Sequence, residues 1–201
     1  MKPFLLVCLV FVAVCLPLSA HAQTRSKPQE YVFEPQVNPK NWKEFSSSEG
    51  RFSIVAPGAL EQEDQEVLTT RGTPVTLHFF RMSANAEYTV VYLDEASPVE
   101  GTGQEKMVLE TFRDLAVQAV KGRLVNDIEI KFDGHPAHLQ TVEYGTENKY
   151  LLTTKTIIVG RRVYMISTSY LRDLSPGATR MHDEWAARFR ESFKLHTEIK
   201  P

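Results

Sequence analysis

The segment KYLLTTKTIIVGRRVYMISTSY, residues 149–170, indicates the fold class of the chain. It consists of two runs rich in β-branched and aromatic residues, a composition that favours strands. Gly160 and Arg161 separate the runs and form a linker of the length found in tight two-residue hairpin turns. We therefore predict an antiparallel hairpin with strands over 149–159 and 162–170.

A helix is predicted directly after this hairpin. Ser175 is a residue type that caps helices, and Pro176 suits the first helical position because proline lacks the N–H that is unpaired there. An apolar row at intervals of four residues follows, formed by Met181, Trp185, Phe189 and Phe193. Residues four apart share one face of a helix, so this row is predicted to pack in the core.

The chain before the hairpin is predicted to contain seven further strands. Turn signals rich in Gly, Pro, Ser and Asn separate them, and Asp133-Gly134 is a strong hairpin signal. The predicted strands cover residues 42–46, 51–56, 61–70, 75–82, 87–93, 124–132 and 137–144.

One more helix interrupts these strands. Thr102 and Glu105 have the spacing of a capping box, in which each side chain bonds an otherwise unpaired backbone N–H. An apolar stripe follows at helical spacing: Val108, Phe112, Leu115, Ala116 and Ala119. Gly122 is placed to end the helix. Strands, helix, strands and helix in this order predict an α+β fold, a largely antiparallel sheet flanked by helices in an α/β/α sandwich.

The N-terminus has the pattern of a secretory signal. Lys2 precedes an apolar run over 4–16, and Ala20-His21-Ala22 is a small-x-small cleavage motif. We predict a signal peptide over 1–22 with cleavage between Ala22 and Gln23, a flexible linker over 23–41, and a single domain over 42–201. Both cysteines, Cys8 and Cys15, lie in the leader, so no disulfide or thiolate metal site is predicted in the mature chain.

Charge and composition exclude several classes of protein. Lys and Arg number 23 and Asp and Glu number 25, a balance that does not suit a nucleic-acid binder. Aromatic residues make up 10% of the chain, which argues against disorder. With the leader, this composition predicts a secreted globular protein, located in a bacterial periplasm and without a membrane span in the mature chain.

His135 and His138 are the best candidates for a metal site, with Asp133 as a third ligand. Residues three apart in a strand point to opposite faces, so the favoured interpretation is a turn with both histidines on its exposed shoulders. The acidic residues Glu61, Glu63, Asp64 and Glu66 are similarly interpreted as an exposed strand whose charges discourage edge pairing, rather than a calcium site.

Other catalytic patterns are missing from the sequence. It has no G-x-S-x-G motif, phosphate loop or dinucleotide fingerprint. Arg161 and Arg162 could pair with an acidic partner, but they are interpreted as solvated charges at a hairpin tip. We therefore predict no catalytic residue, no metal and no cofactor.

Two segments resemble PsbP-like proteins, named for the extrinsic P subunit of photosystem II. WKEFSSSEGRFSI, residues 42–54, resembles the opening hairpin of that family. VGRRVYMI, residues 159–166, with Trp185, Phe189 and the segment SFKL over 192–195, resembles its final hairpin and C-terminal helix. The resemblance implies a sheet sandwiched by helices and a role as an accessory or binding protein rather than an enzyme. It transfers no functional residue, since no ligand-binding motif of the family matches.

Three functions follow from this sequence. The favoured one is a secreted, non-catalytic accessory or binding module for an unknown protein or envelope complex. The alternative is a small-ligand carrier with an apolar pocket between sheet and helix. The remote alternative is a metal-dependent hydrolase centred on His135 and His138.

Overall fold

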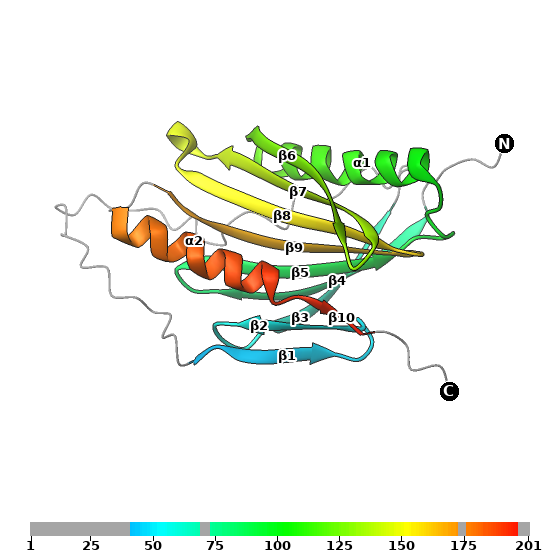
Figure 1. The fold of residues 1–201 in the computed structure, drawn as a ribbon, viewed down its shortest axis with the longest axis horizontal. Coiled ribbons are helices and arrows are strands. Elements are labelled where there is room, and N and C mark those ends of the chain that lie inside the picture. The colour runs from blue at the N-terminus through cyan, green and yellow to red at the C-terminus, as the bar shows by residue number, and fades with distance from the viewer. Residues whose placement is uncertain (1–40, 69–72, 173–175, 197–201) are drawn as a thin grey trace.

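The computed structural model describes residues 41–68, 73–172 and 176–196. Seven antiparallel strands form the main sheet in the order β3-β4-β5-β9-β8-β7-β6, and a small sheet has the order β1-β2-β10 (Figure 1). The elements are β1 (Lys43–Ser47), β2 (Phe52–Ala56), β3 (Glu61–Leu68), β4 (Pro74–Ser83), β5 (Ala86–Asp94), α1 (Thr102–Val120), β6 (Arg123–Phe132), β7 (His135–Tyr144), the 3-10 turn η2 (Thr146–Asn148), β8 (Tyr150–Val159), β9 (Arg162–Leu171), α2 (Pro176–Glu191) and β10 (Lys194–Leu195). The predicted leader, its cleavage site and the predicted linker up to residue 40 lie outside the described residues.

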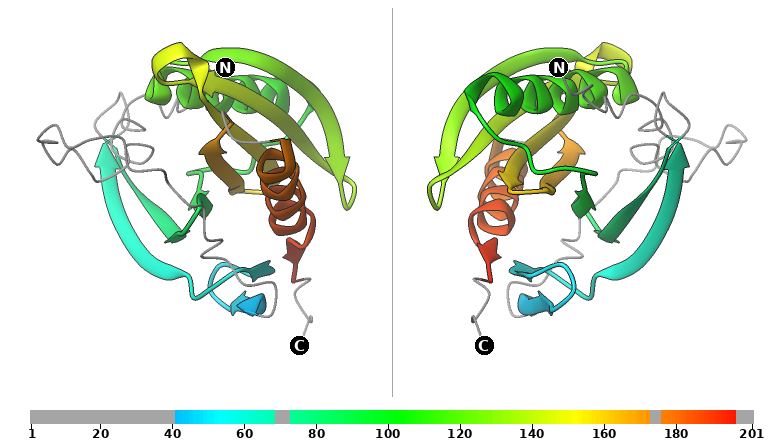
Figure 2. Two further views of the ribbon diagram at one scale, coloured as in Figure 1. Left: turned by 90° about the vertical axis from the view of Figure 1, so that its left-hand side faces the viewer. Right: turned by 90° about the vertical axis from the view of Figure 1, so that its right-hand side faces the viewer.

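The two helices lie on opposite faces of the main sheet (Figure 2). Helix α1 packs on β7 and β8, whereas α2 packs on β9 and β5 and also contacts β2 of the small sheet. The predicted α+β sandwich is therefore confirmed, with the addition of a second sheet. Each helix covers only part of its face, and this partial cover creates the candidate site described below. Within the described residues, neither helix combines the length and the apolar character needed to cross a membrane.

Strands β5 and β9 contribute to two cores because successive side chains point to opposite faces. On the α2 face, Tyr88, Val90 and Ile166 pack with Trp185 and Phe189 of the helix. On the α1 face, buried residues of the same two strands pack with apolar residues of α1: Val91, Leu93, Val163 and Met165 with Val108, Leu109 and Phe112. Burial on both faces explains why the segment 149–170 is so rich in apolar residues.

The two strongest local predictions are confirmed. Val159 and Arg162 pair across the Gly160-Arg161 turn. Phe132 and His135 pair across Asp133-Gly134. Helix α2 begins at Pro176 as predicted, and the predicted cap, Ser175, lies outside the described residues.

The predicted capping box at Thr102 is wrong. The N-cap of α1 is Gly101, with φ 85° and ψ 142°, and no side chain caps the helix. The Gly101 carbonyl accepts hydrogen bonds from the backbone N–H groups of Gln104 and Glu105, each at 3.0 Å. Thr102 is already helical, so its hydroxyl lies one residue too late to act as the cap.

Gly122 also differs from its predicted role. The left-handed residue that ends α1 is Lys121, with φ 50° and ψ 43°. Gly122 is required instead by close packing, since a Cβ there would lie 2.5 Å from Val142 Cγ1 and 2.6 Å from the Glu143 carbonyl oxygen. The glycine thus lets the end of the helix approach the backbone of β7.

Replacement of Gly122 by alanine should therefore destabilise the fold. We expect the free energy of unfolding to fall by about 2 kcal/mol, because the β7 backbone must move to make room. Gly103→Ala is the matched control, since a Cβ at that helical position meets nothing within 4 Å. Urea unfolding of both variants measures the difference. Equal midpoints would contradict this account.

The short strand β10, which follows α2, was not predicted from the sequence. Lys194 and Leu195 of β10 pair with Ser53 and Phe52 of β2. Ser192 supports this sheet by accepting a hydrogen bond of 2.8 Å from the backbone N–H of Val55. A strand of two residues has no periodicity to detect, so only the tertiary structure shows it.

His182 of α2 makes the stability of the α2-face core depend on pH. Its side chain is buried, and its ring stacks on Tyr170 with centroids 5.5 Å apart. Burial lowers its pKa from 6.5, and the neighbouring Asp183 opposes this shift only partly. The neutral ring is therefore the form that the folded protein stabilises.

Stability should consequently fall as the pH falls through about 6.5, because the unfolded chain takes up a proton that the folded chain resists. We expect His182→Phe to flatten the decline in the free energy of unfolding between pH 7 and pH 5. His135→Gln, in the β6–β7 hairpin, is the control. Denaturant unfolding across this range tests the expectation, and an unchanged slope in His182→Phe would refute it.

Candidate ligand-binding groove

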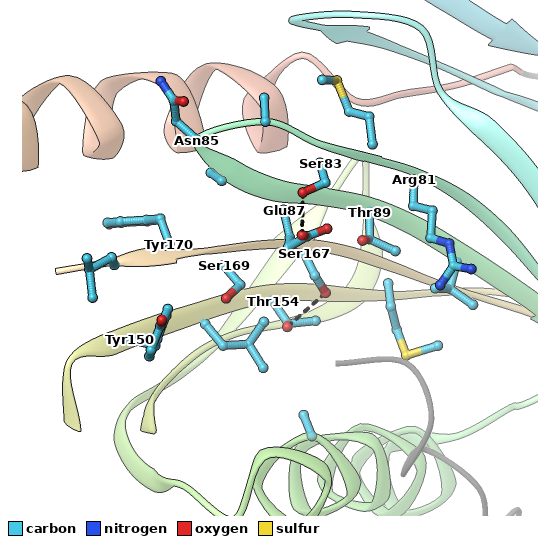
Figure 3. Close-up of a pocket in the computed structure, with 18 of the residues that line it drawn as sticks. Arg81, Ser83, Asn85, Glu87, Thr89, Tyr150, Thr154, Ser167, Ser169 and Tyr170 are labelled. Carbon is cyan, nitrogen blue, oxygen red and sulfur yellow. Dashed lines mark hydrogen bonds between the residues drawn. The ribbon is translucent and has the colours of Figure 1, made fainter. Parts of the chain in front are cut away.

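The part of the α1 face that α1 leaves uncovered forms a groove. Its volume is about 670 Å³, and Phe112 and Ala116 of α1 are among its lining residues. The groove lies over β4, β5, β9 and β8, and α1 borders it (Figure 3). This volume is within the usual range for small-molecule sites, roughly 300–1,000 Å³. The core residues predicted from the sequence do not account for this groove.

Strand register sets the chemistry of the groove floor. Residues paired across antiparallel strands point to the same face. One cross-strand row is Arg81, Thr89, Ser167 and Thr154, and the next is Ser83, Glu87 and Ser169. Under α1 the same face of β5 and β9 is apolar, with Val91, Leu93, Val163 and Met165. The floor thus changes from apolar to polar where the cover of α1 ends.

The floor hydroxyls are already partly hydrogen-bonded. Thr154 and Ser167 share a bond of 2.9 Å, and Ser83 donates to Glu87 Oε1 at 2.6 Å (Figure 3). The Ser169 hydroxyl bonds the Tyr144 hydroxyl at 2.6 Å. A hydroxyl offers one donor and two acceptor positions, so each group keeps capacity for a ligand. These bonds hold the floor side chains in defined orientations.

The cross-strand row that contains Thr154 continues beneath α1. Gln140 of β7 pairs with Thr154 and is only 1% exposed. Neither its Oε1 nor its Nε2 has a hydrogen-bond partner within the described part of the chain. A buried amide without partners is costly, and Gln140 lies beneath α1 and is not among the residues that line the groove.

One end of the groove is aromatic. Tyr150 is 39% exposed and stacks on Tyr144 with ring centroids 5.3 Å apart and an angle of 29° between the planes. The Tyr170 ring points away from the groove into the α2-face core, where its hydroxyl donates a hydrogen bond to Asp183 and burial raises its pKa. Tyr170 is therefore neutral at physiological pH.

Few charges line the groove. Arg81 forms an ion pair with Glu63 on the neighbouring strand, and the lining carboxylates are Glu61 and Glu87. The lining residues within the described ranges include neither histidine nor lysine. The groove therefore combines a few neutral hydroxyl groups on its floor with a more extensive apolar lining, which includes Met82, Leu152 and Leu171.

The predicted metal candidates do not come together at this groove. His138 is buried, contrary to the prediction of an exposed turn, and its Nδ1 lies 3.1 Å from Asp127 Oδ1. Arg113 of α1 donates to the other oxygen of Asp127 at 3.0 Å. Asp133 is the turn residue that was predicted, and His135 is half-buried at the start of β7. No group of three or more metal-binding side chains occurs within the described ranges.

The acidic run is confirmed as part of an exposed edge strand, since β3 ends the main sheet. Two of its carboxylates have partners on β4: Glu63 pairs with Arg81, and Asp64 Oδ1 lies 2.9 Å from His78 Nδ1. These cross-strand pairs fix the register of β3.

The interpretation of Arg162 as a solvated hairpin charge is wrong. Its Nε and Nη2 donate to the two carboxylate oxygens of Asp94 at 2.8 and 2.7 Å. Its Nη1 donates to the Glu49 carbonyl at 2.7 Å, and its guanidinium lies 4.3 Å from the centre of the Tyr92 ring. These three hydrogen bonds and the ring contact compensate the guanidinium for its burial.

Sequence reasoning missed the groove residues. The signal that could have found them is the polar half of each alternating strand, Glu87 and Thr89 in β5 and Ser167 and Ser169 in β9. That signal has meaning only when the position of α1 is known, because the same pattern describes any strand with one solvated face.

Comparison with known proteins shows similarity at the level of structure only. No family model and no curated protein matches the sequence. The structure of cyanobacterial PsbP (CyanoP) from Synechocystis sp. PCC 6803 is similar with a TM-score of 0.53 and 13% identity, over 79% of this chain and 95% of that one.

Two weaker similarities involve bacterial proteins. One is PA94 from Pseudomonas aeruginosa, a protein of unknown function described as a putative regulator, with a TM-score of 0.39 and 17% identity over 72% of this chain and 90% of that one. The other is LpqN from Mycobacterium tuberculosis, described as involved in cell envelope biogenesis, with a TM-score of 0.38 and 14% identity over 79% and 80%. The match to CyanoP, over most of both chains, shows that this chain has the PsbP-like fold that the sequence resemblance implied.

Proposed function

We propose that this chain is an exported, non-catalytic binding protein of the bacterial envelope, and that the groove is its binding surface. The observation that carries the proposal is the change of side-chain chemistry on β5 and β9. Positions under α1 are apolar and complete a core, whereas the uncovered positions on the same face of β5 and β9 are polar: Thr89, Ser167 and Ser169 carry hydroxyls and Glu87 carries a carboxylate. A face that served stability alone would have no need of a cavity lined in this way.

Binding fits the groove better than catalysis does. A serine or threonine nucleophile needs an adjacent base, and none of the floor hydroxyls bonds a histidine or lysine among the described contacts. Within the described ranges, the carboxylate that accepts from a floor hydroxyl is that of Glu87, on the exposed surface of β5. The geometry gives no support to a metal-dependent hydrolase, because His138 and Asp127 form a contact beneath α1 instead.

The predicted leader supports the proposed location of the protein in the cell envelope. The signal-like segment 1–22 and the motif that ends at Ala22 support export across a membrane. The occupant of the groove would then be a component of the envelope, either part of a complex or a small ligand that the protein carries. The small-ligand role is supported by the cavity between sheet and helix, although its floor is polar rather than apolar.

Photo-crosslinking in cells tests this proposal. A benzophenone amino acid replaces exposed Ser83 beside the groove floor or, as the control, exposed Ile128 on the opposite face of the main sheet. We expect adducts from position 83 in the exported fraction and none at the same level from position 128. Equal capture at both positions, or none at either, would contradict the assignment of the groove.

A further inference from the structure

The polar floor sets the first requirement for the occupant of the groove. Thr89, Ser167 and Thr154 lie on adjacent strands, which are about 4.8 Å apart. An apolar ligand would cover these hydroxyls without offering them partners, and that is unfavourable. The occupant must therefore present donors and acceptors at short intervals along the floor.

The charges set the second requirement. The only cationic side chain of the lining among the described residues is Arg81, and Glu63 already pairs with it. Glu61 and Glu87 are both exposed, so water screens their attraction for a cation as well as their repulsion of an anion. The lining thus offers no buried, unpaired charge to bind a charged group, and a neutral occupant suits the floor best.

The walls set the third requirement. Val91, Met165 and Phe112 line the inner end, and the exposed Tyr150 ring stands at the other end. The occupant must therefore combine hydroxyl-rich edges with apolar faces. A pyranose ring has this combination, because its hydroxyls project from the edge and its C–H bonds form the faces that stack on aromatic rings.

We propose that the groove binds a neutral oligosaccharide, with its hydroxyls on the rows of Thr89, Ser167, Thr154 and Ser169 and a sugar face on Tyr150. This inference rests on the proposed function and names the class of ligand. A chain of sugar units also suits a groove that extends across several strands.

The test measures binding of the purified mature protein to an array of neutral glycans and, by calorimetry, to maltotetraose, cellotetraose and chitotetraose. Palmitate and spermidine represent the apolar-anion and cation classes. We expect saturable binding of at least one neutral glycan and none of palmitate or spermidine.

A paired substitution places the binding in the groove. Thr154→Val with Ser167→Ala removes two hydroxyls that bond each other, so neither is left without a partner. We expect affinity for the bound glycan to fall at least tenfold. The matched control is Thr141→Val with Thr153→Val, whose hydroxyls lie 3.3 Å apart on the opposite face, and it should bind normally.

Each outcome bears on the inference. Absence of binding to every neutral glycan overturns it, and so does glycan binding that the Thr154 and Ser167 pair does not weaken. Binding of spermidine that Glu87→Gln abolishes, or of palmitate, assigns another ligand class. In those cases adducts from position 83 in cells would still support the proposed function, whereas their absence would count against both.

Discussion

Replacement of Asp94 by alanine is expected to lower the free energy of unfolding by about 3 kcal/mol, the low end of the range for removal of one partner of a buried ion pair, because the Asp94 side chain is itself 44% exposed. Arg162 is 7% exposed, and its charge would lose the carboxylate that both Nε and Nη2 reach. The hydrogen bonds from Arg162 also hold the pKa of Asp94 below 3.8. This contribution is therefore complete above about pH 4 and is lost as acid protonates the carboxylate.

A double variant distinguishes the effect of losing the ion pair between Asp94 and Arg162 from the effect of losing side-chain packing. Asp94→Leu combined with Arg162→Met removes both charges, so the buried guanidinium no longer lacks its partner. We expect it to regain most of the stability lost in Asp94→Ala, as uncharged replacements of buried pairs often do. Thermal and urea unfolding of the three proteins measure this coupling. A double variant as unstable as Asp94→Ala would show that the ion pair is not the cause.

Phe52→Ala is expected to have an effect of similar size, a loss of about 4 kcal/mol, because truncation of a fully buried Phe leaves a large cavity. The ring is 0% exposed and lies 5.4 Å from the Phe193 ring and 5.3 Å from the Phe80 ring. Phe193 precedes β10, and Phe80 belongs to β4. Phe52 therefore joins the small sheet to the main one.

Phe45→Ala is the matched control, since this neighbouring ring is only partly buried. We expect it to cost less than half as much. Hydrogen exchange should show early loss of protection in β1, β2 and β10 of Phe52→Ala, while the centre of the main sheet stays protected. Uniform loss of protection across both sheets would contradict this joining role.

Local signals explain which parts of the fold could be predicted. The hairpin over 149–170, the Asp133-Gly134 turn and Pro176 are determined by neighbours in sequence, and the structure confirms them. The burial of Arg162 depends on Asp94, which lies 68 residues away, so the pattern of charge at the turn gave the wrong interpretation. Gly122 lies near the end of α1 as predicted, but a glycine is required there by close packing on the backbone of β7 and not by the helix cap.

The candidate groove was less predictable from the sequence, because it depends on which part of one sheet face α1 covers as well as on the residues of that face. The polar residues of β5 and β9 were visible in the sequence, but only the placement of α1 on β7 and β8 shows that they border a cavity. The resemblance to PsbP-like proteins predicted the arrangement of layers and no site residue.

Alternation along β5 has a consequence for how the protein can vary. Tyr88 and Val90 belong to the α2-face core, whereas Glu87 and Thr89 face the groove on the other side of the same strand. Binding preference can therefore change by single substitutions at every second position without loss of the residues that keep the protein folded. Homologues with this sheet could diverge in what they bind while their stability is inherited unchanged. In protein engineering, the groove-facing residues of β5 can be substituted while its core-facing residues are kept.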